Sequence, residues 1–194
     1  MPLLPDSMHT TARKIYEWYE SKQEGHREHL GASLIGHHCD RFLWLTFRWA
    51  ASPQFEGRIL RLFNSGKREE GRIYDELRAI GVELHTEEAG QQISCRDDTG
   101  HFGGSVDGIG LGFPEAPKSW AILEIKTASN KSFTSLKAKG VEADKPQHYA
   151  QMQTYMGLMK LDRAMYICVN KDTDDLHSEW RESEDDPQES AVHN

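Results

Sequence analysis

The sequence has few cysteines and no long apolar run. The three cysteines, Cys39, Cys95 and Cys168, lie far apart and none belongs to a CxxC pair, which argues against a disulfide framework, a zinc ribbon or a cysteine-ligated cluster. No run of about 18 apolar residues occurs, and the opening residues lack a basic region followed by an apolar core, so neither a membrane span nor secretion is expected. These absences favour a reducing, cytoplasmic setting without a membrane partner.

The chain also lacks an overall excess of positive charge. Its net charge is −8, but residues 172–194 alone hold nine acids and one arginine, and the rest of the chain is neutral. Residues 126–145, in contrast, have five lysines against two acids. This segment, which includes Lys131, Lys137 and Lys139, is either a solvated connection or a surface that receives a polyanion.

Hydrophobic periodicity predicts three helices followed by a sheet. The helices are expected at residues 7–22, 31–50 and 53–81, with Ser7, Ser33 and Ser52 as N-caps, Pro53 as the first residue of the third helix and Gly81 as its stop. Four segments of β character predict an antiparallel meander at residues 82–88, 91–98, 101–113 and 120–129. The remaining elements are expected to be helices at 131–139 and 146–161 and strands at 164–170 and 176–180.

The third expected helix has one apolar face that includes an acid. Spacings of three and four predict a single inward stripe formed by Ile59, Leu62, Gly66, Glu70, Ile73, Leu77 and Ile80. Glu70 puts a carboxylate where the neighbouring stripe positions are apolar. It is either a surface residue beside a slightly rotated stripe or a member of a functional site.

The strand expected at residues 120–129, WAILEIKTAS, carries two charges in an apolar run. Because side chains alternate along a strand, Glu124 and Lys126 project from one face, about 6 to 7 Å apart at their Cα atoms. Asp107 lies between glycines in GGSVDGIG, at the end of a strand that is expected to pair with this one, so it should lie near Glu124. With Glu70 facing the same sheet, three carboxylates and one lysine are expected to converge.

Three converging carboxylates require a neutralising cation. Oxygen ligands suit Mg²⁺ or Mn²⁺ better than zinc, and the main-chain carbonyl of Ile125 could add a further oxygen. Such a site suits phosphodiester hydrolysis, in which Lys126 would orient the attacking hydroxide and stabilise charge at phosphorus. An isolated ExK triplet is frequent and an aspartate between glycines is usually a turn, so the hypothesis depends on the order and spacing of the motifs.

Four motifs in this order resemble the PD-(D/E)XK nuclease superfamily: GKREE with Glu70, GGSVDG with Asp107, LEIKT with Glu124 and Lys126, and QMQTY. Gln151 and Tyr155 of the last motif match the QxxxY pattern of the RecB-like and phage recombination exonuclease branch. The resemblance covers residues 31–180. Val106 stands where the pattern has proline, and Glu70 stands where many RecB-like members have histidine.

The resemblance implies an α/β fold with a restriction-endonuclease-like core, in which a central mixed sheet is flanked by helices. It implies that Glu70, Asp107 and Glu124 bind the metal and act with Lys126 in catalysis, and that Gln151 and Tyr155 lie near the DNA or the active-site lysine. Contacts of Arg41, Lys131, Lys137 and Lys139 with DNA are expected from their positive charge. From the residues alone, Gln151 and Tyr155 could equally form a polar helix edge, and Arg41 either binds phosphate or pairs with an acid. Cys168 belongs to no late cysteine cluster, so an iron–sulfur cluster is not expected.

The function expected from the resemblance is a Mg²⁺-dependent DNA exonuclease of phage-type recombination, replication or repair, in the cytoplasm of a bacterial or phage-infected cell. The alternatives are a structure-specific or nicking endonuclease with the same site and a DNA-binding module without catalysis. A single-strand annealing or single-strand binding protein is an expected partner, and an oligomer is compatible with the resemblance. We expect one nuclease domain over residues 1–180, with helices in 7–81 and the sheet and catalytic core in 82–180, followed by a disordered acidic tail at 181–194.

Overall fold

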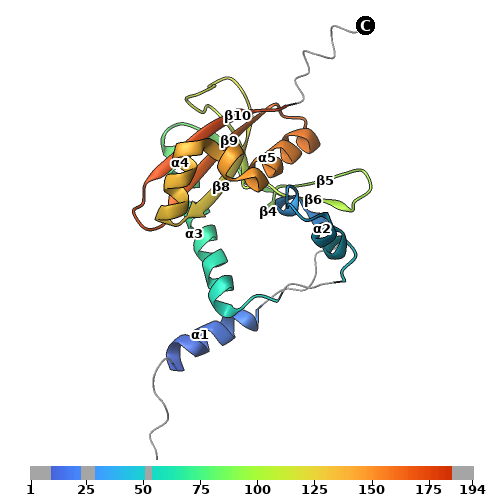
Figure 1. The fold of residues 1–194 in the computed structure, drawn as a ribbon. Helices are drawn as coiled ribbons and strands as arrows, with labels where there is room; N and C mark the ends of the chain where they lie inside the picture. The colour runs from blue at the N-terminus through green and yellow to red at the C-terminus, as the bar shows by residue number, and fades with distance from the viewer. Residues whose placement is uncertain (1–9, 23–28, 51–53, 185–194) are drawn as a thin grey trace, which may run out of the picture.

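The protein is organised around a mixed five-stranded sheet. The computed structural model describes residues 10–22, 29–50 and 54–184. The strand order is β10-β9-β8-β7-β2, with β2 at Glu83–His85, β7 at Gly108–Leu111, β8 at Ala121–Ala128, β9 at Arg163–Asn170 and β10 at Leu176–Glu182. Figure 1 labels β8, β9 and β10 side by side. β8 and β9 are parallel, and the other neighbours are antiparallel. The predicted α/β fold with a central mixed sheet is therefore confirmed.

Helices cover both faces of this sheet (Figure 1). On one face, α3 (Gly57–Ala79) packs its residues Ile73 and Leu77 against Leu123 and Ile125 of β8. On the other face, α4 (Asn130–Asp144) and α5 (Pro146–Met159) form a second apolar cluster with residues that include Ile122 of β8. The alternation of side chains along β8 therefore supplies both cores. Among the described residues, no helix combines the length and the apolar character that a bilayer span needs.

The apolar stripe of α3 is buried only in its C-terminal half. Ile73 and Leu77 are 3% and 7% exposed, whereas Leu62 and Ile80 are 38% and 66% exposed. The N-terminal half packs instead on α1 (Thr10–Glu20), where a Cβ on Gly57 would overlap the backbone of Tyr16. The predicted single inward face was wrong in extent, because the sheet covers only part of a helix of this length.

The second predicted helix is interrupted. The segment forms a 3₁₀ turn at Ala32–Leu34 and a shorter helix, α2, at Asp40–Phe47. Ser33 lies inside the turn and is not an N-cap, since the residue before α2 is Cys39. Gly36 between the two elements has a φ of +80°, and a Cβ there would lie 2.9 Å from Ala150 of α5. The predicted caps Ser7 and Ser52, with Pro53, lie outside the described residues.

The predicted meander is divided between two sheets. The segment 101–113 breaks at Val106 and Asp107 into β6 (Phe102–Ser105) and β7. β6 pairs with β1 (Leu30–Gly31) and β5 (Ser94–Arg96) in a second sheet of order β1-β6-β5, and a small hairpin joins β3 (Glu87–Glu88) to β4 (Gln91–Gln92). In the central sheet β7 and β8 pair as the meander predicts, whereas β2 pairs with β7 and not with the segment that follows it in the chain.

Candidate active site

The pair of charged residues on β8 lies on one face of the strand, as alternation predicts. The Glu124 side chain is only 1% exposed, and its Oε1 forms an ion pair with the ammonium of Lys126, which is 28% exposed. Glu124 Oε2 has no hydrogen-bond partner among the described residues. A buried carboxylate oxygen without a partner is costly, so this pocket is suited to a further positive group.

Asp107 reaches the same strand from the neighbouring one. β7 pairs with β8 in a register that sets Gly108 opposite Leu123, so Asp107 stands opposite Glu124. Its Oδ2 accepts a hydrogen bond of 2.7 Å from the backbone N–H of Ile125. The N–H and C=O of a strand residue point to the same edge, and the carbonyl of Ile125 therefore also points towards Asp107.

Glu70 approaches the site from α3 on the other face of the sheet. Its side chain is half-buried, and burial, followed by the negative charge of Asp107, raises the pKa of Glu70, while Lys126 and Lys67 act to lower it. Glu70 therefore lies within electrostatic reach of both Asp107 and Lys126, and it is only partly exposed.

Burial makes the carboxyl groups of Glu124 and Asp107 harder to ionise, whereas Lys126 stays protonated and charged. Burial raises the pKa of Glu124 to about 7, with Lys126 lowering it and Asp107 raising it further. Burial also raises the pKa of Asp107, against the opposing effects of Lys126 and of the Ile125 N–H. For Lys126, burial acts to lower the pKa, but Glu124 and Asp107 outweigh it and raise the pKa, so the ammonium stays charged at neutral pH.

The oxygen atoms of the site suit a hard divalent cation, although the side chains do not surround a position for one. Three carboxylates and the Ile125 carbonyl offer only oxygen, as Mg²⁺ and Mn²⁺ prefer. In this conformation, no group of three or more His, Cys, Asp or Glu side chains within the described ranges is arranged to hold a metal ion. Glu124 is turned to Lys126 and Asp107 to the Ile125 amide. Metal binding by this set would therefore require its side chains to reorient.

Gln151 and Tyr155 of α5 are hydrogen-bonded to each other and to the backbone just before Asp107. Both are buried on α5, at 5% and 2% exposure, so neither belongs to a solvated helix edge. Gln151 Nε2 donates to the Tyr155 hydroxyl at 3.2 Å, and that hydroxyl donates to the Ser105 carbonyl at 2.9 Å. Burial, with the negative charge of Glu124, raises the pKa of Tyr155 to about 12. The pair thus fixes the backbone two residues before Asp107.

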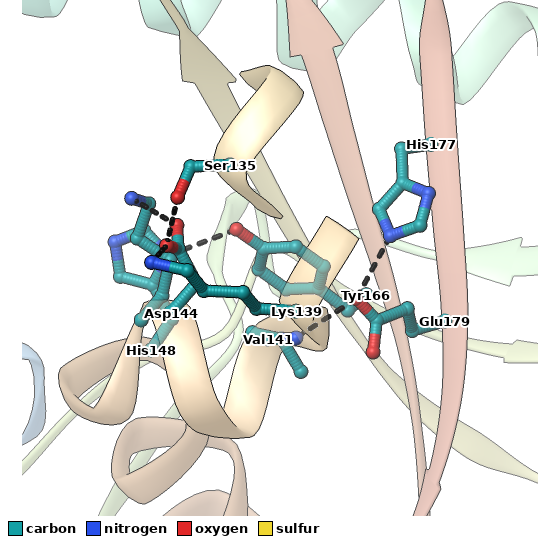
Figure 2. Close-up of polar contacts among 9 residues, drawn as sticks. Ser135, Lys139, Val141, Asp144, His148, Tyr166, His177 and Glu179 are labelled. Atoms are coloured by element: carbon teal, nitrogen blue, oxygen red, sulfur yellow. Dashed lines mark hydrogen bonds and ion pairs between the residues drawn. The ribbon is translucent and has the colours of Figure 1, made fainter. Parts of the chain in front are cut away.

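The cations predicted to contact DNA have different local partners. Lys139 pairs with Asp144 at 3.5 Å near the end of α4 (Figure 2), and Lys145 pairs with the same carboxylate at 2.6 Å. Lys137 lies over the ring of Phe133, 5.7 Å from its centroid, and Lys131 is exposed near the start of α4. Arg41 is exposed on α2 and pairs with no acid in the described part of the chain.

Tyr74 is a site residue that sequence reasoning missed. It follows Glu70 by one helical turn on α3, so both side chains point to the same region. Burial raises its pKa first, and the negative charges of Asp107, Glu70 and Glu124 raise it further, while Arg78 lowers it. The Tyr74 phenol therefore stays protonated beside the carboxylates and can donate a hydrogen bond there. In the sequence, only its spacing of four residues from Glu70 indicated that it would lie near Glu70.

Comparison with known proteins gives a fold but no family. No protein-family model matches the chain, and no curated protein matches it. An alkaline exonuclease, LHK-Exo from Laribacter hongkongensis, has a similar structure, with a TM-score of 0.57, 16% identity, and coverage of 91% of this chain and 86% of that one. The same exonuclease in complex with dAMP gives a TM-score of 0.55 at 14% identity, covering 89% and 83%.

A further solved structure, that of SSO0001, has a TM-score of 0.50 and 13% identity, covering 94% of this chain and 81% of its own. At identities this low, the likeness concerns the fold. The chain has a mixed α/β fold, with a central mixed sheet flanked by helices, similar to that of an alkaline exonuclease.

Proposed function

We propose that this protein is a metal-dependent DNA exonuclease that hydrolyses phosphodiester bonds in phage-type recombination, replication or repair. The observation that carries the proposal is the ion pair of Lys126 with the buried Glu124 on β8, within electrostatic reach of Asp107 and Glu70. The exonuclease-like fold supports it, and the dAMP complex of LHK-Exo shows that this neighbour binds a nucleotide.

Each residue of the site has a role that follows from its position. Glu70, Asp107, Glu124 and the Ile125 carbonyl would hold Mg²⁺ or Mn²⁺, which when bound supplies Lewis-acid activation of a phosphoryl oxygen and of the attacking water. Lys126 carries a lasting positive charge next to Glu124, and it stabilises the negative charge that develops on the phosphoryl group. Gln151 and Tyr155 hold the Ser105 backbone, and so position Asp107.

The test is hydrolysis of end-labelled DNA by the purified chain. Linear single-stranded, linear double-stranded and closed circular substrates are incubated with Mg²⁺, with Mn²⁺ or with EDTA. Shortening of the linear substrates only in the presence of a metal, with the circle intact, supports an exonuclease. Cutting of the circle would replace it with the endonuclease alternative, and no cleavage under any condition would overturn the proposal.

A pair of aspartate variants links cleavage to the site. Asp107→Asn should abolish cleavage, because it removes a negative ligand while nearly preserving the shape of the side chain. Asp98→Asn changes an exposed aspartate in the loop after β5 and should cleave like the parent protein. Equal activity of the two variants would remove Asp107 from the mechanism.

Partner proteins and assembly remain predictions of the sequence resemblance. A single-strand annealing or single-strand binding protein would receive the strand that an exonuclease leaves. Co-purification with such a protein on a resected duplex, and the mass of the free protein in solution, are the measurements that test these two predictions.

A further inference from the structure

A groove of about 480 Å³ lies between α1 and the N-terminal half of α3, away from the carboxylate site. Figure 1 shows α1 at the end of α3 that is remote from the sheet. The groove lining includes three cations, Lys14, Arg61 and Arg68, and two aromatic rings, Trp18 and Tyr19. No acid is among the described residues that line it. Cations and aromatic rings in one groove are the combination that binds single-stranded nucleic acid.

The charge along α3 changes sign between the groove and the site. Residues 57–68, GRILRLFNSGKR, hold four cations and no acid, and Glu69 and Glu70 follow directly. Within the described part of the chain, neither Arg61 nor Arg68 forms an ion pair. Lys14 pairs with Glu17 at 3.4 Å, and Glu17 also pairs with Arg13. Arg61 and Arg68, the two arginines of this half-helix that line the groove, are therefore a local positive charge in a chain of net charge −8.

The aromatic side chains of the groove are held in place but still accessible. Trp18 is 51% exposed, packs edge-to-face on Tyr19 at 4.9 Å, and has the ammonium of Lys22 4.3 Å from its ring centroid. The Tyr19 hydroxyl accepts a hydrogen bond from Asn64 of α3 at 3.2 Å. Because Lys22 covers part of the indole, a base would stack on the exposed remainder, and Lys22 would add positive charge beside its phosphate.

We propose that the groove between α1 and α3 binds a single strand of DNA that continues along α3 to the carboxylate site. From Arg61 to Glu70 the helix rises about 13 to 14 Å and makes about two and a half turns, so the strand would pass partly around α3. At about 3.4 Å per phosphate along a stacked strand, the rise alone corresponds to about four nucleotides, and the path around the helix needs more. The phosphates contact Arg61 and Arg68, and a base stacks on Trp18. The choice of DNA among polyanions rests on the proposed nuclease function.

The test is fluorescence anisotropy of an end-labelled single-stranded oligonucleotide with the full chain, in EDTA so that no cleavage occurs. Trp18→Ala should weaken binding by about tenfold, the usual effect of losing one stacked base. Arg61→Ala and Arg68→Ala should each lower the slope of log K against log salt by about 0.7, as expected for one phosphate contact to a single strand.

Two matched variants serve as controls. Arg58→Ala removes an arginine of α3 that does not line the groove, and Trp44→Ala removes a tryptophan of α2 that is 60% exposed. Both should bind like the parent protein. If the groove variants bind no more weakly than these controls, the inference is wrong. Equal dependence of closed circular duplex binding on Trp18 would also overturn it, because the bases inside a closed duplex have no exposed face on which Trp18 could stack.

Failure of the groove and failure of the proposed function give different results. A parent protein that cleaves linear DNA while the Trp18 and arginine variants bind normally would remove the groove and leave the nuclease proposal standing. A parent protein that neither binds nor cleaves DNA would overturn both. Loss of strand binding in the groove variants, with a helical content equal to that of the parent by circular dichroism, would support the inference.

Discussion

Replacement of His148 by glutamine is expected to remove an acid-sensitive part of the folding free energy. The ring Nδ1 of His148 lies 2.9 Å from the hydroxyl of Tyr166, a contact visible in Figure 2. Burial, followed by the positive charges of Lys126 and Lys145, lowers the pKa of His148 from 6.5 to about 4. Between these two pH values the unfolded chain protonates the histidine and the folded protein does not.

The sign and size of the effect follow from this difference in proton binding. As the pH falls below 6.5, the unfolded state gains a proton that the folded state lacks, so the free energy of unfolding falls. At about 1.4 kcal/mol for each pH unit, the loss reaches about 3 kcal/mol near the folded pKa and then stops. This is a large share of the ~5–15 kcal/mol that stabilises a typical domain.

Urea denaturation of the parent protein and of His148→Gln over this pH range measures the effect. The parent curve is insufficient alone, because the raised pKa values of Glu124 and Asp107 make the folded state bind protons and act in the opposite direction. The difference between the two proteins should change by about 3 kcal/mol between neutral pH and pH about 4. His85→Gln, at a side chain that is 55% exposed, should follow the parent. If the free energies of unfolding of the parent and of His148→Gln change with pH in parallel, the reasoning is refuted.

Two matched pairs test the packing. Gly140 is the non-helical residue at a kink inside α4. Gly140→Ala should destabilise the protein by about 1 to 2 kcal/mol in urea denaturation, because Gly140 has a φ of +79° and a Cβ would lie 3.2 Å from the Arg181 guanidinium. Gly71→Ala, in open space on α3, should stabilise it by about 0.5 to 1 kcal/mol, and a shift of the same sign at both glycines would contradict this view of the kink. Leu77→Ala should cost about 2 to 5 kcal/mol and Leu62→Ala less than about 1 kcal/mol. Equal losses at the two leucines would mean that both halves of α3 are buried.

Local rules were enough to predict the central strand of the site. Alternation along 120–129 predicted that Glu124 and Lys126 share a face. In β8 (Ala121–Ala128) the two side chains do lie on one face and form an ion pair. The next step needed only the pairing of consecutive strands, which sets Asp107 opposite Glu124. Both steps rely on backbone geometry that depends little on the rest of the fold.

The extent of burial along α3 could not be predicted in the same way. Periodicity shows which residues share a helix face, but it does not show what covers that face. Ile73 packs against the sheet, whereas Leu62 lies past the edge of the sheet and is 38% exposed. The second sheet was missed for a related reason, since Gly103 and Gly104 in β6 have no side chains to reveal which way the strand faces.

The site contains features that depend on long-range packing. The contact between Asp107 and the Ile125 N–H replaces the expected direct convergence of three carboxylates. Tyr74 was missed because an aromatic residue at helical spacing is usually part of a core. Its proximity to Asp107 becomes evident only when α3 is docked on the sheet. The pairing of Gln151 with Tyr155 was predicted to be near the site by resemblance, and their burial excludes a solvated helix edge.

Cleavage of end-labelled linear DNA by Lys126→Ala in Mg²⁺ tests the central claim most directly. The variant should lose cleavage by about 10² to 10³-fold, the usual effect of removing one group that stabilises transition-state charge, while still binding DNA in EDTA and retaining the circular dichroism of the parent protein. Lys118→Ala, at an exposed turn, should cleave normally. A folded Lys126→Ala variant that cleaves DNA at the parent rate would contradict the assignment of this site as the catalytic centre.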